Sequence, residues 1–145
     1  MRKLLTFFAA LAAVATPNFA FAQTQIFGSR GATTAISCDQ YTPFGNLATA
    51  TTKELVPLSS GKTVYVCGFE MHATAATTVT LVYGTGTNCG TGVQNITDDY
   101  DFVAADGLVS RSATNHGMKT AVSNALCVKN SSTNKITGGV YWTQF

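Results

Sequence analysis

Apolar and polar residues alternate along much of the chain, a pattern typical of β-strands that bury one face. Within residues 63–73, the side chains of Tyr65, Cys67, Phe69 and Met71 fall on one face, while a glycine, a glutamate and a histidine fall on the other. This alternation predicts a half-buried strand with Cys67 pointing toward the core.

The same pattern predicts further strands, rich in the threonine and other β-branched residues that suit a pleated sheet. These segments are 51–56, 77–84, 100–104, 108–112, 118–122, 125–129 and 136–145, with a weaker strand at 25–38. Asp106 and Gly107 are predicted to form the turn of a hairpin that joins two of the strands. In the last strand, Val140 and Trp142 share one face and Tyr141 lies on the other.

Short strands that recur at intervals of about 8 to 12 residues are typical of sandwiches and barrels. Clusters of Gly, Asn and Ser separate the segments, and no stripe with a helical period of 3.6 residues is visible. The sequence therefore predicts an all-β fold, namely a single antiparallel β-sandwich of the jelly-roll type. A sheet face rich in threonine stays wettable without charge, and it also suits a surface that pairs with copies of itself.

The chain has an even number of cysteines, which in an exported protein indicates disulfides. The cysteines are Cys38, Cys67, Cys89 and Cys127. None has the close C-x2-C spacing that a zinc site requires. Cys38 and Cys67 are both expected to point inward, whereas Cys127 lies opposite the apolar face formed by Leu126 and Val128. Of the three pairings that four cysteines allow, strand parity favours Cys38 with Cys67 and Cys89 with Cys127.

Residues 1–22 have the features of a secretory signal peptide. Arg2 and Lys3 form a basic end, an apolar run follows over residues 4–14, and Ala20 and Ala22 flank a small-x-small cleavage site. The apolar run is shorter than the roughly 20 residues that span a bilayer. We therefore expect cleavage after Ala22, a single domain over residues 23–145, no membrane insertion after cleavage, and a secreted or periplasmic location.

Charge and glycine spacing exclude several classes of function. The chain has nine Lys and Arg against seven Asp and Glu, so removal of Arg2 and Lys3 leaves seven of each sign. The basic residues are scattered singly, whereas nucleic-acid binding requires a basic surface that neutralises phosphates. Residues 83–92 are rich in glycine, but Cys89 stands where a dinucleotide loop needs its third glycine. We expect neither a nucleic-acid partner nor a cofactor.

No set of residues predicts catalysis or a metal site. Asp98, Asp99 and Asp101 offer carboxylates, but the glycine and the terminal glutamate of an EF-hand loop are missing, which favours a solvated turn over a calcium site. The two histidines, His72 and His116, are more simply polar residues on a strand or loop. Because no nucleophile, base and orienting group can be named together, the sequence predicts no enzyme activity.

Four segments carry a resemblance to a known group of domains. They read "GKTVYVCGFEMHA", "TLVYGTGTNCGTG", "NALCVKN" and "GGVYWTQF". This succession resembles a small β-sandwich domain that recurs in tailed-phage structural proteins, prophage regions and uncharacterised exported bacterial proteins. The resemblance implies a jelly-roll-like module used for assembly or surface attachment, without catalytic residues. The signal peptide is a departure from the virion proteins, which assemble in the cytoplasm.

These observations lead to two hypotheses about function. The first is a secreted, non-enzymatic structural or adhesion protein of phage-like origin, which attaches or forms a homo-oligomer through β-sheet faces or an open edge strand. The alternative is a carbohydrate-binding module for a surface glycan, in which Tyr41, Tyr100 or Trp142 provides an aromatic platform for stacking.

Overall fold

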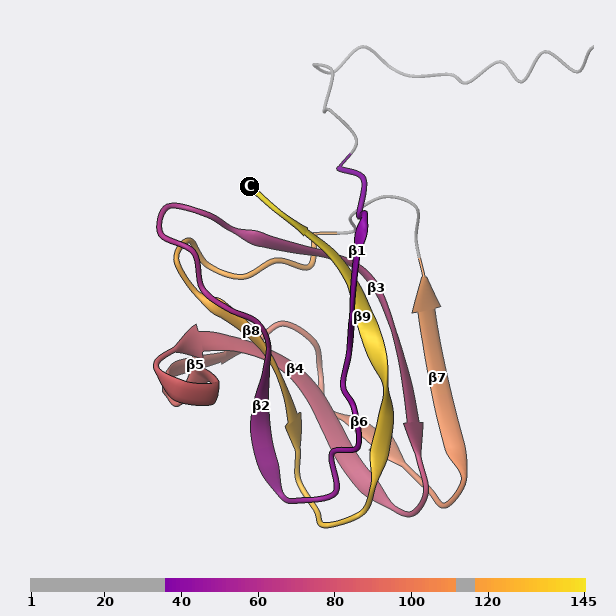
Figure 1. Cartoon of the computed structure of the whole chain (residues 1–145). Helices are drawn as coiled ribbons and strands as arrows, with labels where there is room; N and C mark the ends of the chain where they lie inside the picture. The colour runs from indigo at the N-terminus through magenta and orange to yellow at the C-terminus, as the bar shows by residue number, and fades with distance from the viewer. Residues whose placement is uncertain (1–35, 112–116) are drawn as a thin grey trace, which may run out of the picture. The chain divides into compact units, whose positions relative to one another are not determined.

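The computed structural model describes residues 36–111 and 117–145, which form two antiparallel β-sheets packed against each other (Figure 1). The strands are β1 (Gln40–Pro43), β2 (Thr51–Val56), β3 (Val64–Ala73), β4 (Thr77–Thr85), β5 (Thr91–Asn95), β6 (Tyr100–Phe102), β7 (Asp106–Arg111), β8 (Ala125–Asn130) and β9 (Ile136–Gln144), with a short 3-10 helix η1 (Thr87–Cys89). The predicted signal peptide, 1–22, and nearly all of the predicted strand 25–38 lie outside the described residues.

The strand order is that of a jelly roll, as the sequence predicted. Sheet A has the order β1-β9-β3-β7, and sheet B has the order β2-β8-β4-β5, with β6 also paired to β4. The first strand pairs with the last, β2 with β8, β3 with β7, and β4 with both β5 and β6. This nested pairing folds the chain back on itself across two sheets, which is the jelly-roll arrangement.

Apolar side chains from the inner faces of both sheets form one core. The fully buried residues with the largest side chains are Phe44, Phe69, Met71, Leu81, Leu126 and Ile136. They pack with valines of β3, β4, β8 and β9. In the part of the chain that the structure describes, no helix is long and apolar enough to cross a membrane.

The predicted face of β3 is wrong over its first half, because the strand contains a β-bulge. The register with β9 shifts between Val66 and Gly68, so the alternation of side chains changes there. Val64 and Val66 therefore join Phe69 in the core, and the extra residue, Cys67, does not.

Most of the predicted strands are confirmed, but two local predictions are wrong. Asp106 and Gly107 are not a hairpin turn: they lie within β7 and pair with β3, whereas β6 belongs to the other sheet. The chain crosses from sheet B to sheet A just before β7, at Ala105, which has a φ of 57°. Segment 118–122 forms only an isolated bridge, between Lys119 and Tyr65. β1 and β5 were not predicted.

Both predicted disulfides are confirmed, and each lies within one layer of the sandwich. Cys38, before β1, is bonded to Cys67 of β3, and Cys89 of η1 is bonded to Cys127 of β8. As predicted, Cys127 points away from the core: it forms a second buried cluster with Val82, Cys89 and Ala125. The two sheets are therefore held to each other by the apolar core rather than by sulfur.

Candidate functional site

Aromatic rings and one carboxylate lie together on the outer face of sheet A. We call Tyr41, Glu70, Gly139 and Tyr141 the ring patch. The register of β1 with β9 places Tyr41 opposite Tyr141, and the register of β9 with β3 places Gly139 opposite Glu70. These residues come from three adjacent strands, and opposite residues in antiparallel strands share a face.

Tyr41 reaches across β9 to β3. Its hydroxyl donates a hydrogen bond to Oε1 of Glu70 over 2.8 Å, and its ring centroid lies 4.8 Å from that of Tyr141, with the rings tilted by 47°. A Cβ atom at Gly139 would overlap the phenol ring of Tyr41. Glycine at 139 therefore lets the ring cross close to the backbone of β9, while 45% of Tyr41 stays exposed.

Gly138 allows a second close approach at the same place. Its φ is +129°, and a Cβ atom there would overlap the backbone carbonyl of Glu70. Such a backbone angle strongly favours glycine. The "GGVYW" segment is thus explained by two contacts, one between backbones and one under the ring of Tyr41.

His72 and Val109 extend this face toward β7. His72 is exposed, and its ring occupies the space that a side chain at Gly107 would need. Val109 stands opposite Glu70 and is 54% exposed. His116, the other histidine considered in the sequence, lies outside the described residues.

Of the three aromatic residues that were predicted to stack on sugars, only Tyr41 lies on the outer face. Tyr100 packs against the core, with its ring centroid 5.6 Å from that of Phe69. Trp142 also packs against the core, and its indole N–H donates to Oγ1 of Thr42 over 2.9 Å. The sequence correctly placed Tyr141 on the opposite face from Trp142. The contact between Tyr141 and Tyr41 could not be predicted, because it depends on how β1 pairs with β9.

Two of the three aspartates that were considered for calcium are bound to threonines on sheet B. The hydroxyl of Thr78 donates to Oδ1 of Asp101 over 2.7 Å, and that of Thr80 donates to Oδ1 of Asp99. Among the residues that the structure describes, no group of three or more His, Cys, Asp or Glu side chains could hold a metal ion. The threonine and aspartate side chains thus satisfy each other.

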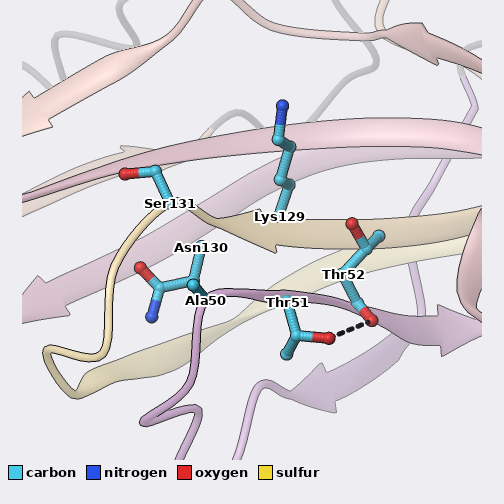
Figure 2. Close-up of a pocket in the computed structure, with 6 residues that line it drawn as sticks. All are labelled: Ala50, Thr51, Thr52, Lys129, Asn130 and Ser131. Atoms are coloured by element: carbon cyan, nitrogen blue, oxygen red, sulfur yellow. Dashed lines mark hydrogen bonds between the residues drawn. The ribbon is translucent and has the colours of Figure 1, made fainter.

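A shallow depression of about 360 Å³ lies between the start of β2 and the end of β8 (Figure 2). Its lining consists of Ala50, Thr51, Thr52, Lys129, Asn130 and Ser131. Figure 2 shows that Lys129 and Asn130 project to different sides of β8. The Asn130 amide is engaged by Thr77 and by the carbonyl of Asn134. The depression thus presents mainly hydroxyls and one ammonium group.

The edge strands of the two sheets differ in how well they are protected from pairing. β1 has four residues and ends at Pro43, and β5 pairs with β4 through an irregular register. On β2, Lys53 lies opposite Val128 of β8 and so points toward the core side of the sheet. Its Nζ donates a hydrogen bond to the carbonyl of Phe44 over 2.6 Å. Proline, bulges and inward-pointing charges all discourage pairing at an edge. β7, visible at the edge of sheet A in Figure 1, keeps a continuous register with β3 over six residues.

No family model, no curated protein and no solved structure matches this chain. Its function is therefore inferred from these surfaces.

Proposed function

We propose that the protein is an exported, non-enzymatic structural or adhesion protein that attaches or assembles through its β-sheet surfaces. The observation that best supports this function is the β7 edge of sheet A. β7 has an unbroken register with β3, contains no proline and has its charged residues, Asp106 and Arg111, only at its two ends, and Val109 is exposed on it.

An edge strand of this kind provides backbone N–H and C=O groups to which another strand can pair. The bulges and the irregular registers of β2 and β5 make those edges poorer templates. A second copy of the chain is the partner that we propose, and the product is a homo-oligomer with extended sheets.

The two disulfides support the proposed location. Disulfides persist in oxidising compartments, and they fit a product released from a signal peptide at residues 1–22. Jelly rolls occur in viral capsid and lectin domains, so the fold agrees with a phage-like structural origin by analogy alone.

Sedimentation velocity and chemical cross-linking of residues 23–145 test the assembly. We expect the wild-type protein to associate at high micromolar concentration, and we expect Val109→Lys to abolish association because a charged edge opposes pairing. Val93→Lys on β5 is the matched control, since Val93 is 44% exposed on the other sheet. A wild-type protein that stays monomeric and attaches to no surface would contradict the proposal.

The ring patch supports a second candidate, carbohydrate binding. Exposed aromatic rings next to hydrogen-bonding side chains are what sugar recognition requires, because a sugar has both apolar C–H faces and hydroxyls. Tyr41, which is 45% exposed, lies on one face with Tyr141 and Glu70, which are partly buried. A glycan array tests this candidate, and an array without any signal would argue against it.

A further inference from the structure

The hydrogen bonds of β9 determine which backbone groups of sheet A point toward β7. Ile136 exchanges both of its backbone hydrogen bonds with Leu47, so its N–H and C=O point away from β3. Ala73 of β3 stands opposite Ile136 and therefore turns its own N–H and C=O away from β9, toward β7. Asp106, which stands opposite Ala73 on β7, thus directs its backbone groups to β3.

Gly107 and Val109 direct their backbone groups outward, away from β3. Successive residues of a strand point their backbone groups to alternate sides, so these two residues are oriented opposite to Asp106. The N–H of Gly107 agrees, because it donates to Oδ1 of Asp106 over 2.7 Å and not to β3. Asp106 thus caps one outward N–H group. Among the residues that the structure describes, the outward N–H and C=O of Val109 have no such cap.

The charges at the two ends of β7 favour an antiparallel pair of identical strands. Asp106 begins the strand and Arg111 ends it. Antiparallel pairing brings the acidic end of each copy beside the basic end of the other, whereas parallel pairing brings like charges together. A second copy, related by a two-fold axis, is therefore the partner whose charges match this edge.

The cap on Gly107 determines where the two-fold axis lies. If Val109 stands opposite Val109 of the second copy, the two residues exchange both N–H···O=C bonds while the Asp106 caps stay in place. If Leu108 stands opposite Leu108, each Gly107 N–H must donate to a Val109 carbonyl, and both caps are lost. We propose that β7 pairs antiparallel with β7 of one second copy about a two-fold axis beside Val109, and that Asp106 sets this register. This pairing rests on the assembly function proposed above and gives it a symmetry and a controlling residue.

The assembly closes at a dimer. Each copy covers β7 of the other, so growth of the joined sheet would need β1, the other edge of sheet A. Phe44 donates its N–H to the carbonyl of Gly138 on β9, so the backbone of the preceding Pro43 points outward. Proline has no N–H to offer another strand. The two four-stranded sheets therefore form one continuous sheet that ends at β1 on both sides.

Sedimentation velocity tests the dimer, and cysteine cross-linking tests its register. Opposite residues of a hydrogen-bonded antiparallel pair have Cα atoms about 5.5 Å apart, which a disulfide can span. We expect Val109→Cys to form an intermolecular disulfide on mild oxidation, whereas Leu108→Cys, which meets its copy only in the alternative register, stays unlinked. Val93→Cys on β5 is the matched control, because Val93 is exposed on the other sheet. Thermal unfolding of each variant confirms that it is folded.

Two substitutions of Asp106 test the cap. Both remove the charge, but Asp106→Asn keeps an oxygen that can accept from Gly107, and Asp106→Ala does not. We expect Asp106→Ala to dimerise about tenfold more tightly than Asp106→Asn, because each freed Gly107 N–H can donate to the carbonyl of Arg111 in the other copy. In the wild-type protein, amide exchange at Val109 should slow as concentration rises, whereas exchange at Leu108, whose N–H points to β3, should not change.

The outcomes separate this pairing from the assembly function on which it rests. If the wild-type protein stays monomeric, both are overturned. If it associates but grows beyond a dimer, or cross-links through Leu108→Cys or Val93→Cys as readily as through Val109→Cys, assembly stands and the two-fold pair at Val109 is wrong. Equal dimerisation of the two Asp106 variants would overturn the role of the cap.

Discussion

The outer faces of the two sheets are built in different ways. On sheet A, rings from β1 and β9 lie over glycine and beside a carboxylate, and Tyr41 and Val109 stay exposed. On sheet B, part of the outer face is buried by η1 and the Cys89–Cys127 disulfide, and two threonines of β4 are bonded to aspartates. The outer side chains of sheet B thus contact one another and stabilise the fold, whereas sheet A exposes apolar groups to solvent.

This difference distinguishes the two sheet faces more sharply than composition does. Threonine-rich faces suit both solubility and self-pairing. The sequence alone therefore did not indicate which of the two sheets would form an interface. Once the threonine hydroxyls of β4 are bound to aspartates, they have less to offer a partner. Substitutions on the two faces should therefore differ in their cost to stability.

The largest difference is expected between the two disulfides. Replacing Cys89 and Cys127 together with alanine should cost about 5 kcal/mol of unfolding free energy, against about 3 kcal/mol for Cys38 and Cys67. Both bridges close loops of similar length, with separations of 38 and 29 residues. However, Cys89 and Cys127 are both completely buried, whereas Cys67 is buried but Cys38 only partly so, and loss of the Cys89–Cys127 bridge therefore removes more packing. Urea unfolding measures both values, and equal costs would show that the outer cluster of sheet B adds no stability.

The next comparison concerns two glycines with positive φ. Gly138→Ala should destabilise by about 3 kcal/mol or more, because the methyl group meets the backbone of Glu70 and the backbone angle is unfavourable. Gly61 has a φ of +74°, and no atom lies within 4 Å of the position that a Cβ atom would take there, so Gly61→Ala should cost only about 1 kcal/mol. Thermal or urea unfolding tests this difference. Similar costs would mean that β9 and β3 can separate at Gly138.

Sequence periodicity predicted what depends on one strand at a time. On β8, uninterrupted alternation placed Cys127 on the opposite face from Leu126, and the predicted bridge to Cys89 is present. On β3, alternation failed at Cys67, because a bulge adds one residue without any local signal that distinguishes it from a regular strand. The Cys38–Cys67 pairing was nevertheless correct.

The ring patch could not be predicted, because it depends on register between strands that are distant in sequence. Tyr41 was named as one of three candidate stacking residues, but Glu70 and Tyr141 become its neighbours only when β9 inserts between β1 and β3. Tyr100 and Trp142 were chosen by residue type, and both pack against the core instead. The edge at β7 was missed because Asp106 and Gly107 have the composition of a turn.

A smaller difference is expected between two valines on the outer faces. Val82→Ala should cost about 2 kcal/mol, because Val82 is fully buried in the outer cluster of sheet B. Val109→Ala on sheet A should stay within about 0.5 kcal/mol, since Val109 is 54% exposed. Urea unfolding of both variants measures the contrast. A large cost at Val109 would mean that another part of the protein or a second copy covers it.

The smallest expected effect tests whether the threonine hydroxyls of sheet B stabilise that sheet. Thr80 is 3% exposed and its hydroxyl donates to Asp99, so Thr80→Val should cost about 1 kcal/mol. Thr78→Val, which removes the more exposed bond to Asp101, should cost less than about 0.5 kcal/mol. Both variants should retain the oligomeric state of the wild-type protein in sedimentation velocity. Valine makes the outer face of sheet B more apolar and leaves β7 intact. A change in association at unchanged stability would therefore show that copies of the chain associate through the face of sheet B and not through the edge of sheet A.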